Sequence, residues 1–179
     1  LIMRNFALLL LAFIWLVIPV QAQEFFDPVQ WNLKVEHIKD DNYQIKITAD
    51  IDQGWHIYSQ KEADIEIAPI PTEFYFNDSP DTFELIGETV EPDIKPIWDA
   101  VFEANIVYFE NTVTFTQDIR VINPEGLIIE VEIGYSACDD EKCLPPEMET
   151  YSISLEGGET LEVSAKLTEE DIAKTEALI

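Results

Sequence analysis

The chain has few cysteines and few basic residues for its length. Only two of its 179 residues are cysteine, Cys138 and Cys143, and only 10 are lysine or arginine, against 36 aspartates and glutamates. The formal net charge of −26 repels nucleic acid and anionic membrane surfaces, so neither is an expected partner. Cationic or neutral proteins are the favoured partners. The composition is 47% hydrophobic and 11% aromatic, which indicates a packed core and not acidic disorder.

Histidine is also scarce, and this argues against a metal site. A structural zinc site uses four ligands, commonly Cys and His. The two histidines, His37 and His56, lie far from the cysteines in the sequence. The acidic residues Asp139, Asp140 and Glu141 would suit calcium or magnesium, but they lack the spacing and the central glycine of a calcium-binding hand. We therefore expect neither a metal nor a cofactor.

Long apolar runs are absent except near the start of the chain. The uncharged run Phe6–Val20 follows the basic start Met3-Arg4-Asn5 and precedes the small-residue site Val20-Gln21-Ala22. Its 15 residues are fewer than the roughly 20 that a membrane-spanning helix needs. The pattern predicts a secretory signal peptide over residues 1–22, with a retained membrane anchor as the alternative. Export would place the chain in an oxidising compartment, where a cysteine pair can form a disulfide.

The remainder is typical of β structure. From Trp31 onward apolar and polar residues alternate with a period of two, most clearly over Leu127–Tyr135. About eight or nine short strands with no normal-length helix between them predict an all-β, immunoglobulin-like antiparallel β-sandwich over residues 23–156. The segment Ile97–Glu103 shows no clear period. The predicted strands are centred on residues 31–36, 43–51, 55–58, 73–76, 83–88, 106–109, 113–117, 127–135 and 151–155.

The acidic tail, residues 157–179, has a different pattern. Gly157-Gly158 ends the last predicted strand. Thr168 resembles an N-cap, and the acidic residues Glu169, Glu170 and Asp171 after it suit the first turn of a helix. A short helix from Glu169 to Ala177 is the expectation.

Both cysteines lie in the segment Tyr135–Pro146, which reads YSACDDEKCLPP. A disulfide between Cys138 and Cys143 closes a small ring, and loop entropy gives such a bond little stabilising effect. A strained or exposed disulfide is also easier to reduce. These residues alone leave two interpretations open: a local structural staple and a redox-active pair.

The charges inside the loop bear on that choice. Carboxylates beside a thiol disfavour the thiolate and raise the pKa of the thiol, and Lys142 next to Cys143 opposes this effect. If the pair is redox active, it should react slowly with random disulfides and quickly only with a docked partner. The alternative is that Asp139, Asp140 and Glu141 simply solvate an exposed loop.

The same segment resembles a known family. Tyr135-x-x-Cys138 with Cys143-x-Pro145-Pro146-Glu147 is similar to the active-site segment of the amino-terminal periplasmic domain of the thiol:disulfide interchange protein DsbD. Further segments, within roughly Trp31 to Leu155, resemble the same domain. They are Gly54–Tyr58, Pro71–Phe74, and Asp99–Phe102 followed by Ile106–Tyr108.

The resemblance implies a function. The family fold is an immunoglobulin-like sandwich with the cysteine pair at one end. Such a domain accepts electrons from a membrane-embedded thiol reductase and passes them to periplasmic thioredoxin-like proteins that carry disulfides. By position, Cys143 would form the mixed disulfide with a partner and Cys138 would resolve it. The implied location is the periplasm, without membrane insertion after signal cleavage.

The resemblance also implies residues around the sulfurs. Asp99 matches a carboxylate of the family's cap loop, and Val101 or Phe102 matches the aromatic lid over the disulfide. Tyr58 and Tyr135 would lie near the pair. The alternative for Tyr58 and Phe102 is that they are ordinary core aromatics, and the alternative for Asp99 is that it is a solvated loop charge. His56, which alternates with its neighbours, is predicted to be a strand-surface residue.

This chain departs from the family pattern at several points. It has one residue fewer between the cysteines than the best-known form. Ala100 and Glu103 stand where an acidic residue and a glycine are expected. The sequence ends at Ile179, without the family's membrane conduit, so electrons are expected from a separate protein. The competing hypothesis is a non-catalytic exported binding module or scaffold in which Cys138–Cys143 is only a structural disulfide.

Overall fold

The computed structural model describes residues 26–77, 79–125, 127–155 and 165–166. The predicted signal peptide and the predicted helix from Glu169 to Ala177 lie outside these residues. Within them all regular secondary structure is β-strand, as predicted, and none is helical. The described segments include no helix with the length and apolar character needed to cross a membrane.

The described residues form thirteen strands, joined mostly by short turns. In two of these turns a residue other than glycine, Asp40 or Asn111, has a left-handed backbone conformation. The strands are β1 (Val29–Lys39), β2 (Asn42–Ile51), β3 (His56–Tyr58), β4 (Glu73–Phe76), β5 (Phe83–Val90), β6 (Ile97–Asp99), β7 (Ala104–Ile106), β8 (Tyr108–Glu110), β9 (Thr112–Val121), β10 (Ile128–Tyr135), β11 (Ala137–Cys138), β12 (Glu147–Ser154) and β13 (Ala165–Lys166).

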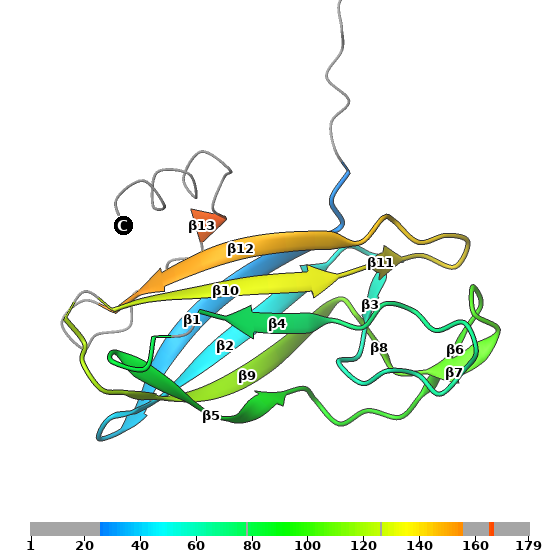
Figure 1. Ribbon diagram of the computed structural model, residues 1–179. Coiled ribbons are helices and arrows are strands. Elements are labelled where there is room, and N and C mark those ends of the chain that lie inside the picture. The colour runs from blue at the N-terminus through cyan, green and yellow to red at the C-terminus, as the bar shows by residue number, and fades with distance from the viewer. Residues whose placement is uncertain (1–25, 78, 126, 156–164, 167–179) are drawn as a thin grey trace, which may run out of the picture.

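Two four-stranded antiparallel sheets make the sandwich. One has the order β1-β2-β9-β5 and the other β13-β12-β10-β4. Figure 1 shows β12, β10 and β4 lying across β1, β2 and β9. This arrangement confirms the predicted immunoglobulin-like fold class. The two-residue strand β13, in the segment predicted as tail, pairs with β12.

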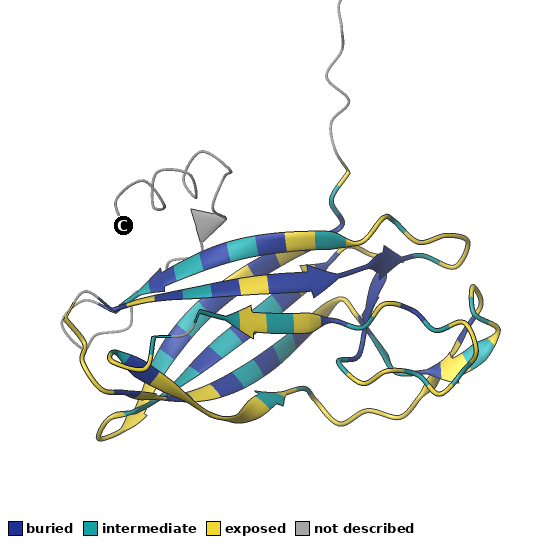
Figure 2. Cartoon of the chain, in the orientation of Figure 1, coloured by how far each residue is buried: buried dark blue, intermediate teal, exposed yellow. Residues whose placement is uncertain are grey.

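The core follows from the alternation of the long strands. In β9, Val113, Phe115, Gln117, Ile119 and Val121 point inward, and the residues between them face outward. The bands of dark blue and yellow in Figure 2 show this period on both sheets. Each fully buried aliphatic or phenyl side chain contributes about 1.5–3 kcal/mol. The rings of Trp31, Phe74, Phe115 and Tyr135 pack together in the middle of the sandwich.

A smaller assembly closes one end of the sandwich. A three-stranded sheet of order β11-β3-β8 and a hairpin of β6 with β7 lie together on the right of Figure 1. The chain leaves β10 at Tyr135 and enters this small sheet almost at once, as β11. Gly54, with φ of +85°, makes the turn before β3. The segment from Ile97 to Glu103, which showed no period, supplies β6 and the turn that leads to β7.

Candidate functional site

The two cysteines form a disulfide at this end of the molecule, with an S–S distance of 2.01 Å. Cys138 ends β11, and Cys143 faces it as an isolated antiparallel bridge partner. Their exposure differs sharply: Cys138 is 0% exposed, whereas Cys143 lies on the surface. Cys143 therefore presents part of its surface to a protein partner, and Cys138 belongs to the interior.

Hydrogen bonds within the loop between the cysteines stabilise its conformation. The carboxylate of Asp139 accepts hydrogen bonds from the N–H groups of Glu141 and Lys142, each at 2.8 Å. The N–H of Asp139 donates to the carbonyl of Lys142 at 2.9 Å. These backbone N–H groups, that of Glu141 first, lower the pKa of Asp139 below its usual value. Asp139 thus stabilises the conformation of the loop that contains Cys143.

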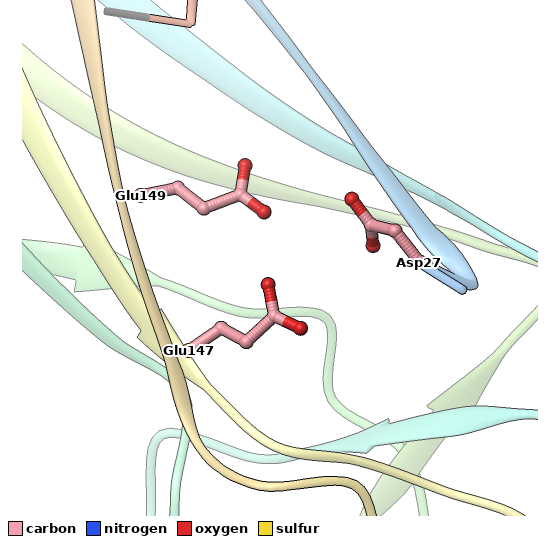
Figure 3. A group of neighbouring side chains, drawn as sticks. All are labelled: Asp27, Glu147 and Glu149. Carbon is pink, nitrogen blue, oxygen red and sulfur yellow. The ribbon is translucent and has the colours of Figure 1, made fainter. Parts of the chain in front are cut away.

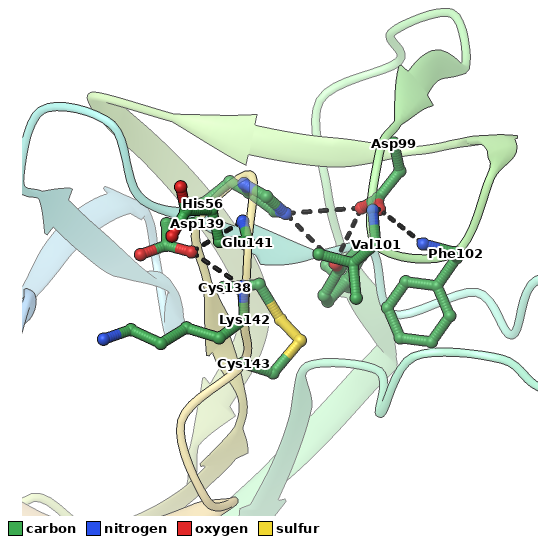
Figure 4. A network of polar contacts seen from close by, with 10 residues as sticks. His56, Asp99, Val101, Phe102, Cys138, Asp139, Glu141, Lys142 and Cys143 are labelled. Atoms are coloured by element: carbon green, nitrogen blue, oxygen red, sulfur yellow. Dashed lines mark hydrogen bonds and ion pairs between the residues drawn. A yellow bond between two sulfur atoms is a disulfide. The ribbon is translucent and has the colours of Figure 1, made fainter.

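A buried polar network lies beside the disulfide (Figure 4). His56 of β3 is the direct antiparallel partner of Cys138. Its Nε2 atom lies 3.0 Å from the hydroxyl of Tyr58 and 3.3 Å from Oδ2 of Asp99. The Tyr58 hydroxyl donates to the same Asp99 oxygen at 2.7 Å. Asp99 is only 2% exposed, so it is not the solvated loop charge of the alternative interpretation.

The other oxygen of Asp99 organises the turn of the β6–β7 hairpin. Oδ1 accepts hydrogen bonds from the N–H of Val101 at 2.8 Å and the N–H of Phe102 at 3.0 Å. One carboxylate therefore joins the strand opposite Cys138 to the turn that bears the predicted lid residues. We call this turn and its two strands, residues 97–106, the cap hairpin.

Burial sets the protonation of the network. Burial lowers the pKa of His56, and the Asp99 carboxylate opposes that effect. Burial also raises the pKa of Tyr58, and the hydrogen bond to Asp99 adds to the increase. Both shifts favour the uncharged side chains. The Asp99 carboxylate accepts hydrogen bonds from Tyr58 and from two backbone N–H groups.

A small, mainly apolar pocket opens against both sulfurs, with a volume of about 170 Å³. Phe102 forms part of its wall and packs edge-on against the ring of Tyr58, at 5.8 Å between centroids and 90° between planes. Cys138, Tyr58 and Ile106 are also packed in one hydrophobic cluster separate from the sandwich core. The residues that line the pocket are Tyr58, Ala68, Pro69, Ile70, Phe102, Ser136, Cys138, Cys143, Leu144 and Pro146.

The structure thus brings together most of the residues singled out from the sequence. One pocket is lined by Cys138, Cys143, Tyr58 and Phe102. Asp99 and Val101 belong to the same hairpin as Phe102 and are hydrogen bonded to each other. Tyr135 does not join them. It lies in the sandwich core, where its ring packs on Trp31 and its hydroxyl donates to Glu149 at 2.9 Å.

The prediction for His56 was wrong. It was expected on a strand surface, yet it is 5% exposed and hydrogen bonded. The physical reason is that β3 lies between β11 and β8 and is covered on both faces, so all three of its residues are buried. Alternation cannot identify such a strand, because it assumes that one face meets water.

A second group of acidic side chains lies away from the sulfurs (Figure 3). Oxygen atoms of Asp27, Glu147 and Glu149 all lie within 4.8 Å of one another. Glu149 is buried and accepts hydrogen bonds from the hydroxyls of Tyr135 and Tyr151. This group could not be predicted from the sequence, because Asp27 is far from the other two residues in the chain.

Comparison with known families identifies the domain. The family described as "Thiol:disulfide interchange protein DsbD, N-terminal" matches residues 22–155. The chain belongs to this family. Membership in the DsbD N-terminal family makes the domain a thiol–disulfide exchange module. The exposed Cys143 and buried Cys138 are the only two cysteines that could carry such exchange.

Two solved structures are similar to this DsbD N-terminal domain. The reduced N-terminal domain of DsbD from Neisseria meningitidis is 16% identical, with a TM-score of 0.48, over 79% of this chain and 98% of that one. The N-terminal periplasmic domain of ScsB from Proteus mirabilis is 13% identical, with a TM-score of 0.49, over 88% of this chain and 56% of that one. No curated protein sequence matches the chain.

Proposed function

We propose that this protein is a periplasmic protein-disulfide reductase. It receives electrons from a membrane-embedded thiol reductase and passes them to thioredoxin-like or other disulfide-bearing proteins. The observation that carries the proposal is the asymmetry of the pair. An exposed Cys143 is bonded to a fully buried Cys138 at the wall of an apolar pocket. A structural staple needs no such exposed sulfur beside a pocket.

The chemistry requires only the two cysteines and a docked partner. In the reduced protein, the Cys143 thiolate attacks a partner disulfide, forms a mixed disulfide and releases one partner thiolate. The Cys138 thiolate then attacks the sulfur of Cys143. The Cys138–Cys143 bond forms, the mixed disulfide breaks, and the second partner thiolate leaves. Two electrons pass from the domain to the partner, and the membrane reductase restores the thiols by the reverse exchange.

The cap hairpin supports selectivity in this proposal. Phe102 narrows the pocket at the sulfurs, and Asp99 fixes the backbone of its turn. A partner must displace or fit around this hairpin before its cysteine reaches Cys143. The loop carboxylates add to this barrier, because they disfavour thiolate formation in the absence of a partner.

Two measurements test the proposal. Equilibration with glutathione or thioredoxin gives the reduction potential of the pair. A potential above about −300 mV supports exchange, whereas a lower one marks an inert structural bond and favours a binding module or scaffold. In the second test, Cys138→Ser leaves the exposed thiol and should trap a thioredoxin-like protein in a mixed disulfide. Cys143→Ser is the matched control, because its remaining thiol is buried and should trap none.

A further inference from the structure

A histidine lies opposite the buried cysteine in the small sheet. His56 and Cys138 are direct partners in the antiparallel pair of β3 and β11. Side chains of such partners project from the same face of the sheet, with Cβ atoms about 4.5–5.5 Å apart. Both residues are buried, so the imidazole and the thiol group lie on the same face of the small sheet, away from bulk water. Lys142, which precedes Cys143 in the sequence, extends away from the sulfurs in Figure 4.

Cys138 needs a proton acceptor that the surface cannot provide. Only a thiolate attacks a disulfide, and burial raises the pKa of a thiol. The carboxylates of the neighbouring loop act in the same direction. A buried thiol that must resolve a mixed disulfide therefore depends on a base within its own surroundings.

The surroundings of His56 suit that role. Burial lowers its pKa, so the imidazole is available in its neutral, proton-accepting form. Once protonated, the imidazolium is stabilised by Asp99, whose Oδ2 lies 3.3 Å from Nε2. The charged and titratable groups that face His56 from the packed elements are Tyr58, Asp99, Tyr108, Glu110, Cys138, Asp139 and Asp140.

We propose that His56 accepts the proton of Cys138 in the second step of thiol–disulfide exchange. The inference rests on the proposed function. When the mixed disulfide is on Cys143, the S–H proton of Cys138 moves to the imidazole, and the Cys138 thiolate attacks Cys143. The partner thiolate leaves and takes a proton from solvent, and the imidazolium returns its own proton to solvent.

The same pair serves the reverse direction. When a thiolate of the electron donor attacks Cys143, the sulfur of Cys138 is the leaving group and becomes the anion. A protonated His56 beside it supplies the proton that converts this thiolate into a thiol. His56 thus acts on the same atom in both directions, and Asp99 holds the charge that appears on the ring.

Stopped-flow kinetics separate the two steps. The protein is reduced with dithiothreitol, freed of it, and mixed with one equivalent of the neutral disulfide dithiodipyridine, which releases thiopyridone at each step. The first release is bimolecular and reports Cys143, and the second is unimolecular and reports Cys138. At neutral pH, His56→Gln should slow the second release about a hundredfold, the low end of the range for general acid–base catalysis. The first release should stay within about twofold, since Cys143 does not depend on the imidazole.

The control is His37→Gln, which removes the only other histidine, an exposed residue of β1. It should leave both releases unchanged. The inference is overturned if His56→Gln leaves the second release unaltered or slows both by the same factor. If that variant does not fold, the wild type decides. Its second release should fall with acid along the imidazole titration followed by NMR, and a mismatch between the two curves overturns the inference. Failure of the proposed function is separate, because it appears as a low reduction potential and an absence of trapped protein.

Discussion

The hydroxyl of Tyr58 donates a 2.7 Å hydrogen bond to Oδ2 of Asp99 and so joins the strand beside the disulfide to the cap hairpin. The two residues are 41 positions apart in the sequence. Because the other Asp99 oxygen holds the N–H groups of Val101 and Phe102, the cap cannot move without loss of hydrogen bonds in the buried network. The shielding of the sulfurs and the polar network are therefore one structural unit.

Loss of the Asp99 charge should loosen this unit. We expect Asp99→Ala to destabilise the protein by about 1–3 kcal/mol, since it leaves buried donors unsatisfied. Dithiothreitol should also reduce the Cys138–Cys143 disulfide several-fold faster, because the cap turn loses its anchor. Urea unfolding and the reduction rate measure the two effects. Asp93→Ala removes an exposed charge from the segment between β5 and β6 and serves as the control. It should change neither the stability nor the reduction rate.

Truncation of Phe102 tests shielding without touching the network. Phe102→Ala should enlarge the pocket and raise the rate at which a bulky reductant such as reduced thioredoxin attacks the disulfide. The stability cost should be about 1–2 kcal/mol, because the ring is only half-buried. Trp98→Ala removes an exposed aromatic of the same hairpin and serves as the control. Equal reduction rates in the two variants would mean that Phe102 does not shield the sulfurs.

The backbone at Glu103 predicts a stabilising change. Its φ of +50° is a left-handed conformation that costs a residue with a Cβ about 1 kcal/mol or more. This is the position at which the family pattern has a glycine. Glu103→Gly should therefore raise the free energy of unfolding by up to about 1 kcal/mol. Glu103→Ala keeps the Cβ and should give no such gain, so urea unfolding of the two variants isolates the backbone effect.

Alkaline pH should destabilise the fold through its buried tyrosines. Burial raises the pKa of Tyr58, Tyr135 and Tyr151, with their hydrogen-bonded carboxylates adding to the effect. The folded pKa exceeds the unfolded value of about 10, so this stability is fully present below pH 10. It is lost as the pH rises above 10, by up to about 1.4 kcal/mol per pH unit for each tyrosine.

Urea unfolding at successive pH values checks this loss, and tyrosinate absorbance checks its origin. The absorbance of these three residues should appear only with unfolding. If it develops in the folded protein near the ordinary tyrosine titration, the tyrosines are not protected in the way that their contacts indicate. Tyr151→Phe should reduce the slope of stability against pH, since it removes one of the three groups.

Alternation sufficed to predict the sandwich because β1, β2, β9, β10 and β12 each have one face on the core and one in water. It failed where strands are short or covered on both sides. The predicted strand 106–109 is in fact the end of β7 and most of β8. The cap hairpin depends on hydrogen bonds that the Asp99 carboxylate accepts from backbone N–H groups, and such bonds leave no periodic pattern in the sequence.

The site shows the same division. The roles of Cys138, Cys143 and the cap residues were predicted from a motif resemblance. The spacing of the cysteines alone left a structural staple and a redox-active pair equally open. The place of His56 opposite Cys138 could not be predicted, because it results from the pairing of β3 with β11, two segments about eighty residues apart. The group of Asp27, Glu147 and Glu149 likewise arises only when the two ends of the sandwich chain meet.

The placement of Cys138 inside the β11–β3 pair has a mechanical consequence. Cys138 belongs to a sheet whose strands are directly connected to strands of the sandwich. Cys143 belongs to a surface loop that folds back on itself. Opening and closing the bond therefore requires displacement of the loop alone, and the sandwich acts as a rigid base. The redox cycle should proceed with almost no change in the rest of the molecule, so that a partner meets nearly the same docking surface in both oxidation states.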